Sequence, residues 1–207
     1  MVKCPPCVWP QGDTEGTKDA WVINSGITGN VVFRRGACIV RGIGGLNFMP
    51  KDPYEMTESE IRQRIVTLAF GGDERLFIAF YRKLQEGLPE GTGIILRGSV
   101  VTNKRHEDGK PFDSQGTATS DLDVTLVGKK VMEAWHPDGY YIPGLHTKPL
   151  CDKDPNIAPS LNALRESLQE LIERPVNFQA TSSLVLYGRD VLFSEAYYVV
   201  VPPGEDA

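Results

Sequence analysis

The sequence predicts an α/β (α+β) fold in which helices flank a mixed sheet, with a small β-rich extension before it. Apolar residues recur at helical spacing in three segments, short apolar runs bounded by turn residues lie between and after them, and glycine-punctuated β-branched runs precede them. A chain of 207 residues can bury the core of one domain with a small accessory lobe. We therefore expect a flexible tail over 1–19, a β-rich accessory segment over 20–56, the main domain over 57–201 and a tail over 202–207.

Composition limits the class of protein. An apolar content of 41% and a charged content of 24% are ordinary for a soluble globular protein. The net charge of −5 argues against non-specific DNA binding, which needs a basic surface, but not against a nucleotide whose phosphates are recruited through a metal. Neither a signal peptide nor an apolar run of the ~20 residues that a spanning helix needs is visible. These features predict a cytoplasmic protein without a membrane partner; a secreted effector exported by another route would share them.

The N-terminal region contains short β candidates and a cysteine pair. Strands are expected near residues 21–23, 30–33 and 37–40, separated by glycine-containing turns. Cys4 and Cys7 have the spacing of a redox motif or half of a zinc site, but four ligands close a zinc site and the other two cysteines are distant. An ordinary tail with two thiols is the favoured interpretation, and a zinc or redox protein stays open as a third one.

Helices are signalled by caps and breakers. Thr57 and Glu60 form a capping box for a helix that ends near Gly71. A second helix is expected over 73–87, where aromatic residues at helical spacing indicate core packing, and a last one over 161–172.

Strands are expected wherever short apolar runs lie between turn residues. They fall over residues 93–97, 121–127, 176–180, 184–187, 191–193 and 197–201. A polar loop over 100–115 and a proline-rich irregular connection over 135–157 complete the domain.

The chemistry concentrates where the first two of these strands meet. Asp121 and Asp123 stand one residue apart, so in a strand they point to the same face and repel each other unless a cation lies between them. A hard divalent ion such as Mg²⁺, or Mn²⁺ in its place, binds few carboxylates together with substrate phosphates. The Gly98-Ser99 pair ends the preceding strand, where backbone N–H groups and a hydroxyl can hold a phosphate.

These pieces form an ordered pattern: Gly98-Ser99, then Gly116-Thr117-Ala118, then Ser120-Asp121-Leu122-Asp123. The pattern resembles that of the nucleotidyltransferase superfamily related to DNA polymerase β, in particular its minimal and antibiotic-modifying members. The resemblance covers roughly residues 73–195 and implies a polymerase-β-like core, with residues 186–189 and 191–193 in its closing strands.

The resemblance implies transfer of a nucleoside monophosphate from a nucleoside triphosphate to a hydroxyl acceptor, with release of pyrophosphate. The acceptor class (small molecule, protein or RNA) stays open. The aspartates Asp121 and Asp123 would be catalytic and hold Mg²⁺. The residues implied in nucleotide binding are Gly98, Ser99, Gly116, Thr117 and Ser120.

The chain departs from the family pattern in two ways. Residues 100–115 are inserted between the Gly-Ser and Gly-Thr-Ala elements, at the lip of the expected site, where they could shape an acceptor pocket or obstruct it. The third catalytic carboxylate of the family corresponds to Asn177, which is neutral and faces the site with Gln179 if Val176 and Phe178 face the core. The alternative hypothesis is therefore a catalytically degraded nucleotidyltransferase fold that acts as a nucleotide-binding or regulatory module.

Overall fold

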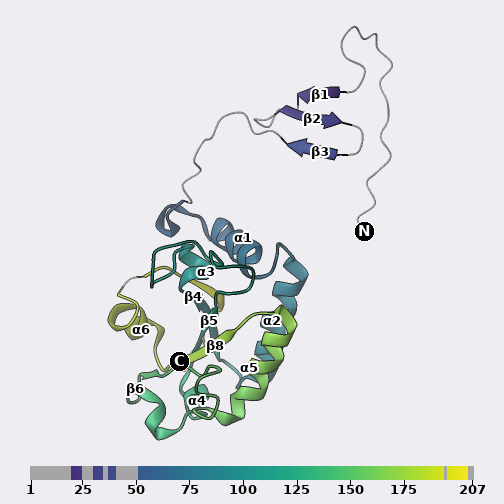
Figure 1. The fold of residues 1–207 in the computed structure, drawn as a ribbon. Helices are drawn as coiled ribbons and strands as arrows, with labels where there is room; N and C mark the ends of the chain where they lie inside the picture. The colour runs from purple at the N-terminus through teal and green to yellow at the C-terminus, as the bar shows by residue number, and fades with distance from the viewer. Residues whose placement is uncertain (1–19, 25–29, 35–36, 41–50, 194, 205–207) are drawn as a thin grey trace. The chain divides into compact units, whose positions relative to one another are not determined.

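A computed structural model describes residues 20–24, 30–34, 37–40, 51–193 and 195–204, and the chain divides into two compact units, Met1–Met49 and Pro50–Ala207 (Figure 1). The first unit contains an antiparallel sheet in the order β1-β2-β3, formed by β1 (Ala20–Asn24), β2 (Asn30–Arg34) and β3 (Ala37–Val40). The strands lie where the glycine-separated runs predicted them. Cys4 and Cys7 lie outside the described residues.

The second unit is built on a six-stranded mixed sheet in the order β6-β7-β8-β5-β4-β9. β5 and β8 are parallel, whereas the other strand pairs are antiparallel. The strands are β4 (Gly93–Arg97), β5 (Leu122–Val127), β6 (Tyr140–Ile142), β7 (His146–Thr147), β8 (Val176–Thr181) and β9 (Tyr197–Val201). The helices are α1 (Glu58–Ala69), α2 (Glu74–Gly87), α3 (Ser99–Thr102), α4 (Lys129–Met132), α5 (Pro159–Ile172) and α6 (Leu184–Asp190), with 3-10 turns η1 (Pro53–Glu55) and η2 (Pro137–Gly139). The predicted mixed α/β architecture is confirmed for this unit.

The capping box at α1 forms as the sequence predicts. The Thr57 hydroxyl oxygen accepts a hydrogen bond from the Glu60 backbone N–H at 3.3 Å, and the Glu60 carboxylate accepts one from the Thr57 N–H at 2.8 Å. The Lys51 ammonium donates to Glu60 at 2.7 Å, and Arg64 donates to the Lys51 carbonyl at 2.5 Å. Lys51 lies in the segment over 20–56 that was expected to be β-rich, but it contacts α1 instead.

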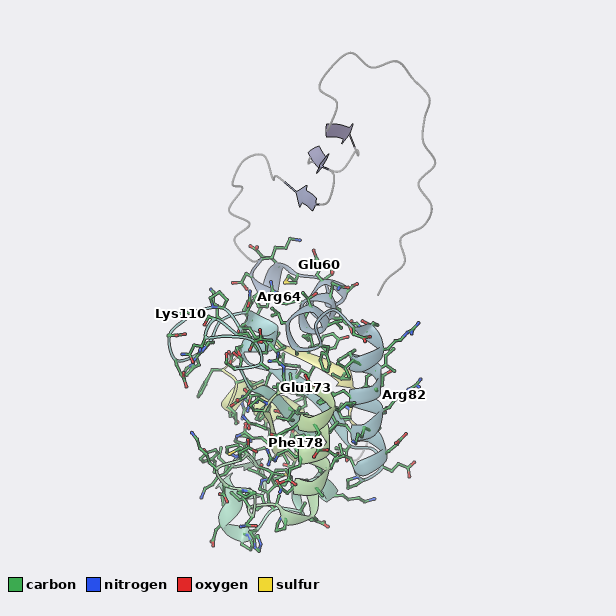
Figure 2. All side chains as sticks on the ribbon, turned by 45° about the vertical axis from the view of Figure 1, so that its right-hand side comes forward. Glu60, Arg64, Arg82, Lys110, Glu173 and Phe178 are labelled. Carbon is green, nitrogen blue, oxygen red and sulfur yellow. The ribbon has the colours of Figure 1, made fainter. Side chains whose placement is uncertain are left out.

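The main core lies between one face of the sheet and helices α1, α2 and α5. Leu96, Val124 and Phe178 project from neighbouring strands into this core and are fully buried. Phe77 and Phe80 of α2 are buried there as well, which confirms that the helical aromatics are core residues. Figure 2 shows Arg82 on the outer side of α2 and Lys110 at the edge of the loop after α3, whereas Phe178 lies inside the unit.

The expectation of strands over 184–187 and 191–193 is wrong. Residues 184–190 form α6, and the structure places no strand over 191–193. The Ser183 hydroxyl caps this helix by accepting a hydrogen bond from the Leu186 N–H at 3.4 Å. Only Tyr187 of this helix is buried while Val185 is 79% exposed, so a run rich in apolar residues presents a single side chain to the sheet. The connection over 135–157, which was expected to be irregular because it is rich in proline, also contains β6 and β7.

Candidate functional site

Three neighbouring strands bring the central residues into one cross-strand row. Arg97 of β4 lies opposite Asp123 of β5, which lies opposite Asn177 of β8. The Asn177 side-chain amide donates hydrogen bonds to Asp121 Oδ2 at 3.0 Å and to Asp123 Oδ1 at 3.3 Å. The two carboxylates therefore converge on one amide group, on the face of the sheet opposite Val124 and the main core.

Ionisation of the Asp123 carboxyl group is energetically unfavourable because the group is buried. Burial raises the pKa of its carboxyl, and the negative charge of Asp121 adds to this effect. Arg97, whose Nη1 lies 3.9 Å from Asp123 Oδ2, and the hydrogen bond from Asn177 act in the opposite direction, but the pKa remains above its ordinary value. A cation bound beside Asp123 would offset this cost, because a nearby positive charge favours the ionised form of a carboxyl group.

Gly98 brings the backbone close to the same carboxylate. Its φ of +72° is favourable for glycine, and a Cβ atom built there would lie 3.0 Å from Asp123 Oδ2. The next residue, Ser99, begins the short helix α3. The Gly-Ser turn is thus packed directly against Asp123.

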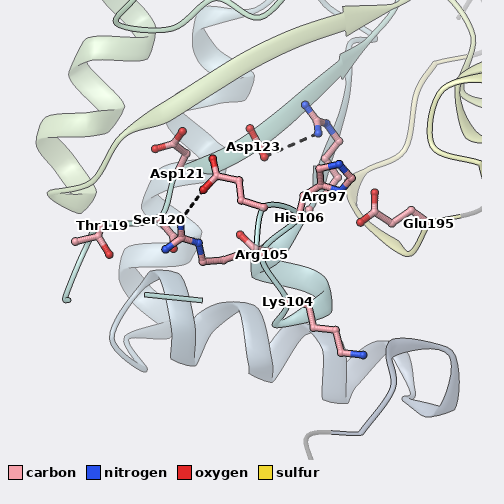
Figure 3. Close-up of a pocket in the computed structure, with 12 residues that line it drawn as sticks. Arg97, Lys104, Arg105, His106, Thr119, Ser120, Asp121, Asp123 and Glu195 are labelled. Atoms are coloured by element: carbon pink, nitrogen blue, oxygen red, sulfur yellow. Dashed lines mark hydrogen bonds and ion pairs between the residues drawn. The ribbon is translucent and has the colours of Figure 1, made fainter. Parts of the chain in front are cut away.

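A pocket of about 370 Å³ opens over these residues, and we call it the aspartate pocket (Figure 3). Asp121, Asp123 and the Gly-Ser turn contribute to its lining, and the inserted loop forms another part of it. Its lining residues are Arg97, Gly98, Ser99, Lys104, Arg105, His106, Glu107, Thr119, Ser120, Asp121, Asp123 and Glu195. In Figure 3, Glu195 lies across the pocket from Asp121, and the Lys104 side chain points away from both aspartates.

The inserted loop is folded through its own contacts. The Arg105 side chain is only 14% exposed and forms ion pairs with Glu107 at 2.8 Å and Asp108 at 3.7 Å. The Arg105 N–H donates to the Lys110 carbonyl at 2.8 Å, and the Gly109 N–H donates to the Arg105 carbonyl at 2.9 Å. This loop therefore forms one part of the pocket wall, through Lys104, Arg105, His106 and Glu107.

A buried ion pair fixes the segment that leads into the aspartates. Asp113 accepts hydrogen bonds from the backbone N–H of Ala118 at 3.0 Å and of Ser120 at 2.8 Å. Arg174 donates to Asp113 Oδ2 at 2.9 Å and to the Ser120 carbonyl at 2.9 Å, and its guanidinium lies 4.7 Å from the centre of the Phe112 ring. Burial alone would raise the pKa of Asp113, but these hydrogen bonds and the charge of Arg174 hold it below its ordinary value. This contact ties the turn before β5 to the residue before Pro175, at the entry to β8.

Arg97 forms hydrogen bonds with a polar network on the face of the sheet that carries Asp123. Its Nε donates to the Thr125 hydroxyl at 3.1 Å, and its Nη2 donates to the Gln179 side-chain oxygen. The Thr125 hydroxyl also lies 3.1 Å from the Tyr187 hydroxyl of α6. His146 packs beside Tyr187 with ring centres 5.0 Å apart, and burial lowers its pKa to about 4. Its Nδ1 has no hydrogen-bond partner among the described residues.

The structure gathers most of the predicted site residues but not all of them. Gly98, Ser99, Ser120, Asp121 and Asp123 line the aspartate pocket. Asn177 is not among its lining residues, but its amide donates hydrogen bonds to both aspartates. Gly116 and Thr117 are exposed and are not among the described residues that line this pocket.

Ser120 carries a structural contact, because its hydroxyl accepts a hydrogen bond from the Asp113 N–H at 2.9 Å. Sequence reasoning missed Arg97, Thr119 and Glu195 as pocket residues, whereas Lys104, Arg105, His106 and Glu107 belong to the loop that was expected at the lip of the site. For Arg97 the signal was available, since it directly precedes Gly98 and faces the same way as Asp123 once the strands pair.

The donor atoms suit one divalent cation. The described part of the chain contains no group of three or more His, Cys, Asp and Glu residues placed to hold a metal. Asp121 and Asp123 supply two converging carboxylates, and half a turn of the Asn177 amide about its last side-chain bond would present Oδ1 in place of Nδ2. Mg²⁺ commonly takes one or two carboxylates and completes its shell with phosphate oxygens and water, so this donor set fits it.

Comparisons of the chain with protein-family models, with curated proteins and with solved structures found no match. Among the described residues, no helix combines the length and the apolar character needed to cross a membrane.

Proposed function

We propose that the protein is a Mg²⁺-dependent nucleotidyltransferase that moves a nucleoside monophosphate from a nucleoside triphosphate to a hydroxyl acceptor. The observation that carries this proposal is the convergence of Asp121, Asp123 and the Gly98-Ser99 turn on one pocket. Paired carboxylates bind the metal ion of a metal-polyphosphate complex, and a Gly-Ser turn beside them accommodates its phosphate groups.

The order and pairing of the elements support the same proposal. A helix precedes the Gly-Ser strand, the aspartate strand pairs with it, and the strand after the long helix α5 pairs with the aspartate strand. This is the order of elements in the superfamily that the sequence resembles. Asn177, which the resemblance matches to the third carboxylate of that superfamily, donates hydrogen bonds to both aspartates.

Each residue has a distinct role in the proposed reaction. Asp121 and Asp123 hold the cation, Gly98 permits close approach of the phosphates, and Ser99 donates a hydrogen bond to one of them. When bound, Mg²⁺ neutralises charge on the triphosphate and on the leaving pyrophosphate. Asp123, with its raised pKa, must lose its proton to bind the cation, so binding strengthens as pH rises through that pKa.

A second function is favoured by one specific observation. Asn177 is neutral and offers an N–H₂ group to the aspartates, whereas enzymes of the superfamily that the sequence resembles usually carry an acid there. A site that binds the metal-nucleotide but activates the acceptor hydroxyl poorly would serve as a nucleotide-binding or regulatory module.

Calorimetric titration with Mg²⁺ and each of the four common nucleoside triphosphates tests binding. We expect Asp121→Asn and Asp123→Asn to abolish binding, and Asp138→Asn, which changes an exposed aspartate on η2, to leave it intact. Equal binding by the wild type and both site variants would reject the proposal.

Turnover separates the two functions. Pyrophosphate release, measured with small-molecule, protein and RNA acceptors, should be detectable in the wild type and lost in Asp123→Ala if the protein is an enzyme. Nucleotide binding without transfer, together with no gain in Asn177→Asp, would favour the regulatory module.

A further inference from the structure

A second cavity adjoins the aspartate pocket. It has a volume of about 640 Å³ and lies between η1, α1, α6 and the start of β9; we call it the apolar pocket. Its lining residues are Pro53, Tyr54, Ile61, Leu184, Val185, Gly188, Arg189, Glu195, Ala196 and Tyr197. Glu195 lines both cavities, so the two pockets are neighbours at this residue.

The walls of the apolar pocket differ in chemistry from those of its neighbour. Ile61, Val185 and Tyr197 give it an aliphatic and aromatic lining, and Val185 and Tyr197 stay 79% and 37% exposed. Single exposed apolar residues are common, but several around one concave site are typical of a ligand pocket. Gly188 leaves room beside Tyr197, because a Cβ built on it would meet only the ring edge of Tyr197, at 3.9 Å.

The order of chemistry along the two cavities matches the order of groups in a nucleotide. A nucleoside triphosphate has a polyanionic end, a sugar with hydroxyl groups, and a flat ring system. The molecule offers a carboxylate pair with a Gly-Ser turn, then Glu195, then a pocket with an exposed tyrosine. Because bases of every kind can stack on an aromatic ring, such a subsite needs no further polar groups to bind one.

We propose that the apolar pocket is the nucleoside subsite, in which the base stacks on Tyr197 and Glu195 accepts a hydrogen bond from a ribose hydroxyl. This inference rests on the proposed function, since the phosphates must lie at the aspartates. A carboxylate is an acceptor only, which suits a sugar hydroxyl and disfavours direct contact with phosphate. The subsite therefore selects ribonucleotides over dideoxynucleotides, whatever their base.

The test compares nucleotides with inorganic tripolyphosphate, which has the anionic end alone. In the presence of Mg²⁺, the full chain should bind ribonucleoside triphosphates more tightly than tripolyphosphate. Tyr197→Ala should weaken nucleotide binding by about 5- to 150-fold, the range expected for loss of one stacking contact, and leave tripolyphosphate binding unchanged. Gly188→Leu, which fills the pocket without removing a contact, should have the same selective effect.

Phe193→Ala is the matched control, because Phe193 is 82% exposed on the same segment and lines neither pocket. Glu195→Ala should bring the affinities for ribonucleotide and 2′,3′-dideoxynucleotide together. All variants are compared by circular dichroism to confirm that they are folded.

The outcomes separate this inference from the proposed function. If tripolyphosphate and nucleotides bind equally in an Asp123-dependent manner, or if Tyr197→Ala and Gly188→Leu weaken both ligands alike, the nucleoside subsite is refuted and the metal-phosphate site stands. If neither ligand binds, or binding ignores Asp123→Asn, the proposed function fails and the subsite fails with it. Selective loss of nucleotide binding in both pocket variants supports the subsite.

Discussion

Replacing Arg174 with methionine should unfold the protein at a markedly lower denaturant concentration. The Arg174 side chain is 5% exposed and pairs with Asp113, 18% exposed, at 2.9 Å. It also donates to the carbonyls of Leu68, Ala69 and Ser120 at 2.9–3.3 Å. Methionine keeps much of the apolar stem and removes every one of these contacts.

The size of the effect follows from the charge left behind. Removing one partner of a buried ion pair typically costs about 3–5 kcal/mol, because the other charge loses its compensation. Asp113 keeps the hydrogen bonds from Ala118 and Ser120, which partly compensates its charge. The contact between the guanidinium and the Phe112 ring adds about 1 kcal/mol to the loss. We therefore expect the free energy of unfolding to fall by roughly 3–4 kcal/mol.

Urea unfolding followed by circular dichroism measures this change, with Arg189→Met as the control. Arg189 pairs with Asp190, but these side chains are 69% and 38% exposed, so the control should lose less than about 1 kcal/mol. A loss in Arg174→Met no greater than in Arg189→Met would refute the assignment of Arg174 as the anchor of the site.

The same pair predicts a dependence on pH. The pKa of Asp113 is held below its ordinary value in the folded protein, so its stabilisation is complete above the unfolded pKa near 3.8 and is lost as pH falls through the folded value. The difference in stability between the wild type and Arg174→Met should therefore narrow on acidification below pH 3.8. A difference that stays constant down to the lowest pH at which the protein folds would contradict this explanation.

Three further changes are expected to act at or beneath the site. Gly98→Ala places a methyl group at a φ of +72° and 3.0 Å from Asp123 Oδ2, so it should lower the free energy of unfolding by about 1–3 kcal/mol, measured by urea unfolding, and weaken Mg²⁺-nucleotide binding. Unchanged binding would show that the close approach of Gly98 to Asp123 is not needed. Asp123→Asn should raise the stability of the ligand-free protein at pH 7. The pKa of Asp123 is higher in the folded than in the unfolded protein, so ionisation of Asp123 destabilises the fold as pH rises through the folded pKa. A lower melting temperature of the variant at pH 7 would contradict this prediction. His146→Phe should reduce the loss of stability that the wild type shows as pH falls from 6.5 to about 4, because the folded protein holds the pKa of His146 at about 4 and the unfolded chain therefore takes up the proton first. Equal acid sensitivity of the two proteins would contradict this prediction.

Much of the fold was predictable because its local signals agree with its packing. The capping box of Thr57 and Glu60, the aromatic stripe of α2 and the apolar run of β4 each specify one element, and each lies where expected. α6 was mistaken for a strand because its run of apolar residues fits either period. The Ser183 cap settles the choice only once Tyr187 has a sheet to pack against.

The site was predictable where its residues are neighbours in sequence. Asp121 and Asp123 meet by strand alternation alone, and Gly98-Ser99 ends the adjacent strand. Arg174 and Asp113 meet only through the tertiary fold, 61 residues apart, so nothing local to either residue marks the pair. Glu195 borders both pockets for the same reason, since its place depends on how the segment after α6 returns to the sheet.

The parallel pairing of β5 with β8 also determines when the site can form during synthesis. Asp123 and Asn177 are 54 residues apart, and Arg97 and Gln179 are 82 residues apart. At a translation rate of about 5–20 residues per second, the aspartate strand leaves the ribosome roughly 3–11 s before its amide partner. During that interval β5 has an unpaired edge and its two acids lack the Asn177 contact. A nascent or truncated chain that ends before β8 therefore leaves the N–H and C=O groups on this edge of β5 without their strand partner.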